Sequence, residues 1–338
     1  MADENNLNYG EIRRLKVPLP FSLRYVNSYI IRDVPAEDAD SADRYTVIDP
    51  GLHTSDAVQV WTETLEAWGI AFDQIRQILL THYHPDHYGL AGWMQQQAGG
   101  VPVRLSRLGH EHAVRLWGDG HAEYANELRQ LYLSHGLDVS LADLMVPHMN
   151  GFVPQVSPQP VITYMEEGEQ LTFGGRTYNL LHTPGHAWGH LCFHDEAGKT
   201  IFCGDQVLPL ITPNVSLLPG SDPNPLNSFM ISLQDLEQLD VEQAYPGHRD
   251  PFRTWHERVR ELLTHHEERL TYIEEHLIAP MTGYELCRLM FGESLTVHQL
   301  RFAMSETLAH LVYLRELKRV VESQTENGVT YFHRQPLY

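Results

Sequence analysis

Apolar residues follow two spacings along the chain. Short apolar runs bounded by turn residues predict strands, and apolar residues three and four positions apart predict helices. In the first 105 residues the two kinds of segment alternate. The predicted strands there are Glu11–Leu19, Tyr25–Ile31, Tyr45–Ile48, Ile75–Leu80 and Val101–Leu105, and the predicted helices are Ser55–Trp68 and Tyr88–Ala98.

The pattern changes after the first block of strands. Residues 106–150 follow helical spacing without an evident strand, and short strands return within 161–203. Strands therefore occur in two blocks, each with helices alongside. A long amphipathic helix is predicted over Thr254–Leu277, and a proline stops it. We expect two domains, residues 1–279 and residues 280–338, with 106–150 as a helical insert in the first.

Charge narrows the classes of function. The chain carries 44 Asp and Glu against 24 Lys and Arg, a formal net charge of -20, which argues against broad phosphate binding. The numbers of basic and acidic residues are equal after residue 280. We therefore do not expect the second domain to bind nucleic acid through a basic surface. No apolar run is long enough for a bilayer, and the first nine residues lack a signal-peptide pattern. We expect a cytoplasmic protein that binds neither membrane nor nucleic acid.

Histidine is unusually frequent, with 21 residues, and one cluster stands out. The sequence His82-Tyr83-His84-Pro85-Asp86-His87 places three imidazoles and a carboxylate on a turn directly after an apolar strand. Side chains this close in the chain can converge on one point, and imidazole with carboxylate suits zinc, iron or manganese. By composition alone, roughly one chance in a few hundred produces this pattern, so a histidine-rich surface turn is the weaker interpretation.

Three further turns follow apolar strands and contain glycine. Their sequences are TPGH at Thr183–His186, FCGD at Phe202–Asp205 and YPGH at Tyr245–His248. Glycine allows the backbone angles that such turns need and a close approach of the backbone. A single His or Asp in a turn is more often an ordinary loop residue than a ligand. Three such turns together with the cluster favour a binuclear metal site.

In this order, the HxHxDH cluster and the TPGH, GD and PGH turns resemble the metallo-β-lactamase-fold hydrolases over roughly residues 10–250. The resemblance implies an α/β (α+β) protein, an αββα four-layer sandwich of two mixed sheets with helices outside. It also implies two divalent metal ions, with zinc preferred and iron or manganese as alternatives. By resemblance, His82, His84 and His186 would bind the first ion, Asp86, His87 and His248 the second, and Asp205 both.

Two more residues are expected to support the ligands. The resemblance assigns Asp49, at the end of a predicted strand, to accept a hydrogen bond from a ligand imidazole and so fix its tautomer. His190 is either a ligand of a third site or a supporting residue, and we favour support because seven ligands already fill two metal ions. Most other histidines lie in helical segments, where we expect solvated faces. Examples are His110, His112, His121, His265, His266 and His276.

The ligand set indicates the class of reaction. A bridging Asp205 with Asp86 and His87 resembles glyoxalase II, lactonases and the ribonuclease branches, whereas the zinc β-lactamases lack that aspartate. By resemblance, two ions hold a bridging hydroxide, which Asp86 and Asp205 orient as the catalytic carboxylates for attack on a carbonyl or phosphoryl centre. We expect hydrolysis of a small ester, thioester or lactone. A metal-dependent ribonuclease or phosphodiesterase and a non-catalytic regulatory protein are the alternatives.

The C-terminal segment resembles the small winged-helix appendage of the lactamase-β-like branch, with a helix in Leu295–Leu317 and a wing over Lys318–Phe332. We expect it to pack on the catalytic domain or to form a homodimer contact. The insert at 106–150 is expected to cover the metal cleft. Its apolar residues either line a pocket for a small acyl substrate or only pack the insert. They are Leu116, Trp117, Tyr124, Leu128, Leu131, Tyr132 and Met145.

Overall fold

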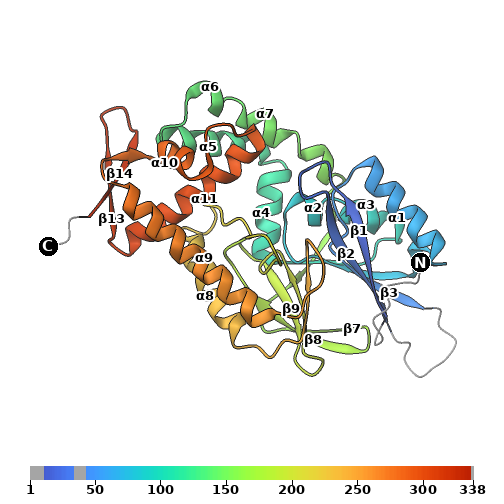
Figure 1. Ribbon diagram of the computed structural model, residues 1–338. Coiled ribbons are helices and arrows are strands. Elements are labelled where there is room, and N and C mark those ends of the chain that lie inside the picture. The colour runs from blue at the N-terminus through green and yellow to red at the C-terminus, as the bar shows by residue number, and fades with distance from the viewer. Residues whose placement is uncertain (1–10, 34–42, 336–338) are drawn as a thin grey trace.

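Two β-sheets packed face to face form the centre of the computed structural model, which describes residues 11–33 and 43–335 (Figure 1). In the first sheet the early strand pairs are antiparallel and the later ones parallel. In spatial order it contains β1 (Ile12–Pro18), β2 (Tyr25–Asp33), β3 (Arg44–Ile48), β4 (Ile75–Leu79), β5 (Val103–Ser106) and β6 (Ile162–Met165). The second contains β11 (Gln243–Pro246), β10 (Thr200–Gly204), β9 (Leu191–Asp195), β8 (Arg176–His182) and β7 (Gln170–Phe173).

Large apolar side chains fill the space between the two sheets. Tyr29 of the first sheet meets Phe202 of the second edge to face, with ring centroids 5.3 Å apart. Phe173 and Tyr178 of the second sheet stack at 4.0 Å. Every residue of β9 and β10 is buried, including the polar His194 and Asp195 at the end of β9, so these strands show no alternation of buried and exposed residues.

Helices cover the outer faces of the sandwich and complete the four layers. The first sheet is covered by α1 (Ser55–Ala67), α2 (Pro85–Tyr88) and α3 (Ala91–Gln97), and the second by α8 (Pro225–Glu237) and α9 (Trp255–His276). Thr54 caps α1, because its hydroxyl accepts a hydrogen bond from the Ala57 backbone amide at 3.1 Å. Trp61 buries the inner face of that helix against the sheet. The expected αββα sandwich is confirmed.

The insert consists of helices, as the sequence pattern predicts. They are α4 (Arg107–Trp117), α5 (His121–Ser134), α6 (Val139–Ala142) and α7 (Met145–Asn150). Tyr124, Leu128, Tyr132 and Met145 are all buried in the main apolar core.

The C-terminal segment packs closely on the rest of the chain. Its long helix is buried at every residue from 303 to 312, so it does not lie on the surface as a separate appendage would. The Tyr132 hydroxyl donates to the backbone carbonyl of Arg301 at 2.8 Å, and the Leu217 amide donates to that of Ser305 at 3.0 Å. The segment contains α10 (Gly283–Phe291), α11 (Val297–Glu316) and a small sheet of β12 (Met281–Thr282), β14 (Thr330–Arg334) and β13 (Val320–Gln324).

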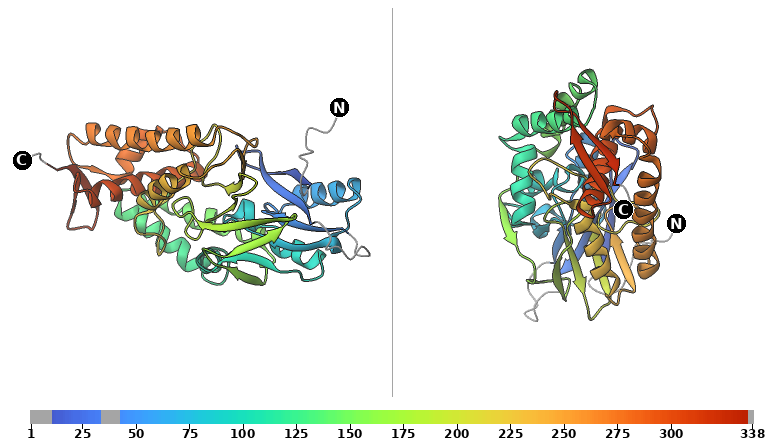
Figure 2. Two further views of the ribbon diagram at one scale, coloured as in Figure 1. Left: turned by 90° about the horizontal axis from the view of Figure 1, so that it is seen from below. Right: turned by 90° about the vertical axis from the view of Figure 1, so that its left-hand side faces the viewer.

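A β-hairpin stands where the sequence predicts the wing, and Figure 2 shows it (dark red) at one end of the molecule, away from the first strands (blue). Packing on the catalytic domain is one of the two arrangements expected for this segment. The winged-helix class, the domain boundary near residue 280 and a homodimer contact stay predictions.

Within the described residues, no helix combines the length and apolar character needed to cross a membrane. The polar N-terminal segment, on which the expected cytoplasmic location partly depends, lies outside the described residues. The location therefore stays a prediction.

Candidate metal centre

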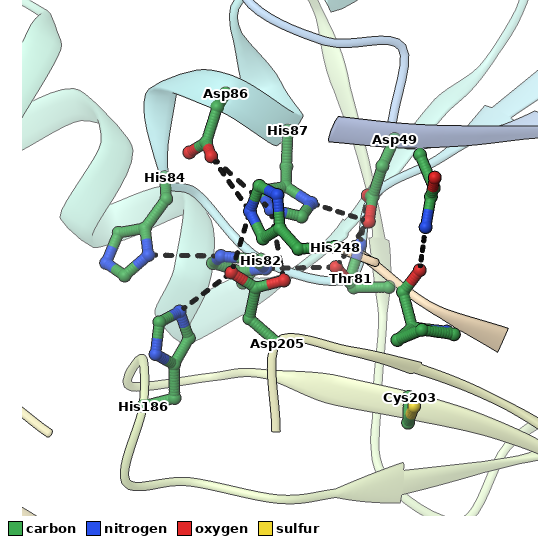
Figure 3. A network of polar contacts seen from close by, with 12 residues as sticks. Asp49, Thr81, His82, His84, Asp86, His87, His186, Cys203, Asp205 and His248 are labelled. Atoms are coloured by element: carbon green, nitrogen blue, oxygen red, sulfur yellow. Dashed lines mark hydrogen bonds and ion pairs between the residues drawn. The ribbon is translucent and has the colours of Figure 1, made fainter. Parts of the chain in front are cut away.

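Turns at strand ends in both sheets bring the predicted ligands together (Figure 3). In the first sheet, β4 runs into the turn that carries His82 and His84, and α2 follows directly with Asp86 and His87. In the second sheet, the turns after β8, β10 and β11 each carry one predicted ligand. These are His186, Asp205 and His248.

Possible ligand atoms form three overlapping groups, in each of which they lie within 4.8 Å of one another. Two of the groups coincide with the two sets that the resemblance implies. The third joins them through Asp205, the predicted bridging residue. The groups are His82 with His84 and His186; Asp86 with His87 and His248; and His82 with His87 and Asp205.

The carboxylate of Asp205 lies among three imidazoles. Its Oδ1 is 3.4 Å from Nε2 of His87, and its Oδ2 is 3.3 Å from Nε2 of His248 and 3.7 Å from Nε2 of His186. A Cβ atom at Gly247 would lie 2.2 Å from Asp205 Oδ1. The glycine of the PGH turn therefore permits the close approach of the last ligand strand.

The imidazoles of His186 and His248 donate hydrogen bonds from Nδ1, so that Nε2 of each ring is directed at the carboxylate of Asp205. The Nδ1–H of His186 donates to the carbonyl of Asn214 at 2.8 Å, and that of His248 donates to the carbonyl of Tyr25 at 2.9 Å. Because a carbonyl only accepts, each Nδ1 carries the proton and each Nε2 has its lone pair available. Nε2 of His87, His186 and His248 and Oδ1 of Asp205 are buried without a hydrogen-bond partner. Such a set of orphaned nitrogen and oxygen atoms fits divalent metal ions.

The electrostatics of the cluster also favour a cation. Burial, with neighbouring imidazoles, holds the pKa of His82 well below its usual value. Burial alone would lower the pKa of His248 too, but the carboxylates of Asp205 and Asp86 raise it to about 10. Asp205 and other carboxylates likewise outweigh burial at His87 and raise its pKa well above the ordinary value. The carboxylates around His248 and His87 therefore favour positive charge at this position, which a divalent metal ion would supply.

Asp49 lies where the resemblance places it, behind a ligand. One carboxylate oxygen accepts the backbone amide of Thr81 at 2.8 Å, and the other accepts the Thr81 hydroxyl at 2.7 Å. The second oxygen is also 2.9 Å from Nδ1 of His87. This contact fixes the tautomer of His87 that leaves Nε2 available for a metal ion.

His190 supports the site from behind Asp205. Its Nε2 accepts the backbone amide of Asp205 at 3.3 Å, and its Nδ1 lies 2.8 Å from the hydroxyl of Thr183. Because both ring nitrogens have a partner, the geometry favours the supporting role over a third metal site.

Asp49→Asn is expected to weaken binding of the ion held by His87 about 10- to 100-fold, because the imidazole loses the carboxylate that orients it. Competition against a chromogenic chelator measures this affinity. Asp33→Asn is the matched control, since Asp33 is a similarly buried carboxylate but accepts from Thr46 and Gly174 away from the cluster. Equal affinities in both variants and in the unmodified protein would contradict the role of Asp49.

A cavity of about 440 Å³ is lined on one side by the cluster. Of the seven candidate lining residues in the insert, Leu116 and Trp117 reach it, and the other five do not. Two of the insert's apolar residues thus line the cavity and the others only pack the insert, so each of the two interpretations holds for part of the set. The remaining apolar walls include Phe21, Phe152 and Ile211.

The long C-terminal helix α11 supplies a whole wall of this cavity, which sequence analysis missed. Polar and apolar residues are mixed around the helix instead of forming one stripe, so the sequence pattern did not indicate which of its faces is buried. Its lining residues are His298, Gln299, Arg301, Phe302, Ala303 and Glu306.

A polar chain links this helix to a ligand. The side-chain amide of Asn214, whose carbonyl accepts from His186, donates to Glu306 at 2.7 Å. Arg269 of α9 pairs with the same carboxylate. The position of His186 therefore depends on the C-terminal segment.

Histidines outside the cluster are not all on solvated faces, contrary to expectation. His112 is buried with its ring stacked 5.4 Å from that of Tyr83, and His266 is buried 3.1 Å from His310, measured between ring nitrogens. Helical spacing places these residues on the inner faces of their helices, where tertiary packing covers them.

Comparison with known proteins gives a consistent result. The family model described as metallo-beta-lactamase superfamily matches residues 22–248, and one described as metallo-beta-lactamase-like, C-terminal domain matches residues 270–335. The chain is 25% identical to the probable metallo-hydrolase YqjP of Bacillus subtilis over 333 residues, which cover 95% of the chain and 97% of that protein.

A solved structure and a partial relative add to this. The crystal structure of the metallo-beta-lactamase family protein TTHA1429 from Thermus thermophilus matches with a TM-score of 0.82 and 32% identity, covering 96% of this chain and 98% of that one. The chain is also 33% identical over 104 residues to acyl-coenzyme A thioesterase MBLAC2 of Gallus gallus. That match covers 30% of this chain and 35% of the thioesterase.

Proposed function

Because the chain belongs to the metallo-beta-lactamase superfamily and is a metal-dependent hydrolase, we propose that it cleaves a small ester, thioester or lactone at a binuclear site. One observation carries this proposal: the cluster of seven ligand residues borders a cavity whose other walls are largely apolar. Such a cavity suits an acyl group better than a polyanion.

The ligand residues form one set for each of two ions, and one residue is shared. We propose that His82, His84 and His186 hold one ion, that Asp86, His87 and His248 hold the other, and that Asp205 contacts both. Zinc is our first choice, and the ligand set also accepts iron and manganese. When bound, the ions supply an activated water and polarise the scissile carbonyl.

The chain itself orients the reacting groups. The carboxylates of Asp86 and Asp205 line the cavity, so they are placed to orient a nucleophilic water toward a bound carbonyl. Asp49 and His190 hold the ligands from behind through the contacts described above. Leu116 and Trp117 face the same space and would contact the acyl group.

Two features favour an acyl substrate over RNA. The cavity of about 440 Å³, with α11 as one wall, has the size of a small-molecule site. The net charge of -20 also disfavours a polyanion. The thioesterase named above supports a thioester as the first substrate to test.

A substrate panel tests this proposal with the zinc- and manganese-loaded protein. Acyl thioesters, lactones, a phosphodiester and single-stranded RNA should be compared in the unmodified protein and in Asp86→Ala. We expect hydrolysis of a thioester or lactone that Asp86→Ala lowers at least about 100-fold, because the carboxylate acts at the reacting centre. RNA cleavage lost in Asp86→Ala, without esterase activity, would overturn the proposal.

A further inference from the structure

One basic side chain in the cavity has no acidic partner. Arg301 of α11 lines the cavity together with the metal ligands. Among the described residues, none forms an ion pair with its guanidinium, and its Nε is buried without a hydrogen-bond partner. Other arginines of the C-terminal segment are paired, Arg288 with Glu293 and Arg315 with Glu322. The absence of a partner is notable in a chain that carries an excess of acidic residues.

Aromatic rings hold the Arg301 side chain in place. Its guanidinium carbon lies 4.0 Å from the ring centroid of Phe302 and 5.9 Å from that of Phe152. The Tyr132 hydroxyl donates to the Arg301 carbonyl and also contacts the Ser305 hydroxyl at 2.7 Å, which fixes this turn of the helix. The rings occupy guanidinium faces, so the N–H edges stay suited to an anion.

Two histidines beside Arg301 also have unpartnered nitrogens. His148 and His298 lie with ring centroids 5.4 Å apart, and His298 lies 5.0 Å from the ring of Phe302. Nε2 of His148 and Nδ1 of His298 are buried without a hydrogen-bond partner. Burial and the charge of Arg301 lower the pKa of both imidazoles to about 4, so they are neutral hydrogen-bonding groups near neutral pH.

A half-buried charge and buried polar nitrogens without partners are costly, and an anionic ligand would relieve that cost. We propose that Arg301, with His298, binds an anionic group of the substrate, a carboxylate or a phosphate, away from the bond that is cleaved. The planar guanidinium matches the paired oxygens of such groups. This inference deepens the proposed function, on which it rests, by assigning a negative charge to the substrate.

Three matched thioesters distinguish the sources of the anion. Pentanoyl-pantetheine carries no anion, glutaryl-pantetheine carries a carboxylate at the end of the acyl group, and pentanoyl-4′-phosphopantetheine carries a phosphate on the thiol side. The metal-loaded protein should prefer one of the anionic substrates over the neutral one by at least about 10-fold in kcat/KM. Equal kcat/KM on all three substrates, or a preference for the neutral one, would overturn the inference.

Substitutions then assign the preference to Arg301. Arg301→Gln should lower kcat/KM on the preferred anionic substrate about 30- to 100-fold and on the neutral one less than about 3-fold. Arg301→Lys, which keeps the charge but not the planar fork, should fall between. Arg315→Gln, on the same helix, should leave the preference unchanged. The inference would be overturned if Arg301→Gln lowered kcat/KM equally on all substrates. If the glutamine variant does not fold, the same result in Arg301→Lys would overturn it.

A binding measurement separates this inference from the proposed function. If no thioester or lactone is hydrolysed, the proposed function fails, and calorimetric titration of the metal-loaded protein with glutarate and with inorganic phosphate decides on the anion subsite. Binding that Arg301→Gln abolishes and Arg315→Gln retains would support the subsite. No binding of either anion by the unmodified protein, or binding unchanged in Arg301→Gln, would overturn it.

Discussion

Asp205→Asn is expected to lower kcat/KM at least about 10³-fold and to remove one or both metal ions. The substitution keeps the size of the side chain but removes the charge that lies among Nε2 of His87, His186 and His248. An amide cannot serve two cations as a carboxylate does, because it offers one oxygen and no negative charge. Elemental analysis of the purified variant gives the metal content, and steady-state kinetics on the substrate identified by the panel give kcat/KM.

A second buried carboxylate provides the control for Asp205→Asn. Asp195 ends β9, is similarly buried and lies 2.9 Å from Arg176, away from the cluster. Asp195→Asn is expected to lower the melting temperature and to leave the metal content unchanged. If Asp205→Asn instead retained two ions and normal kinetics, Asp205 would not be the bridging ligand.

The ligand cluster was predictable because local sequence controls it. His82, His84, Asp86 and His87 lie within six residues at the end of one strand, so their convergence requires only a turn after β4. The approach of the more distant candidate ligands was predictable for a related reason. Each follows an apolar strand through a glycine-containing turn, and strands of a sandwich bring such ends to common edges. The short strands predicted within 161–203 correspond to strands such as β8, β9 and β10.

The wall formed by α11 could not be predicted from local pattern. Its polar residues Ser305, Glu306 and His310 lie in a buried helix and are satisfied by partners far away in the chain. Ser305, for example, meets Tyr132, a residue 173 positions earlier. Contacts at this separation are set by tertiary packing, so the sequence predicted a C-terminal domain that packs on the catalytic domain or forms a dimer contact, but not its part in the cavity.

Removal of residues 280–338 is therefore expected to unfold the catalytic domain and not merely to remove an independent segment. The deletion takes away the buried stretch of α11 at residues 303–312 and uncovers the apolar core beneath it. It also removes Glu306, the partner of Asn214, whose carbonyl orients His186. We expect loss of the cooperative thermal transition and a fall in kcat/KM of at least about 10³-fold, measured by circular dichroism and kinetics.

Two substitutions in the full chain test whether the buried packing of α11, rather than the presence of the C-terminal residues alone, stabilises the protein. Leu311 of α11 is fully buried, and Leu317 at the end of the helix is 48% exposed. Leu311→Asp places a charge in the core and is expected to lower the free energy of unfolding by at least about 4 kcal/mol, whereas Leu317→Asp should change it by less than about 0.5 kcal/mol. A truncated protein that melts and turns over like the full chain would show an independent appendage. The same conclusion would follow from equal stabilities of the two variants, because α11 would then not be part of the catalytic core.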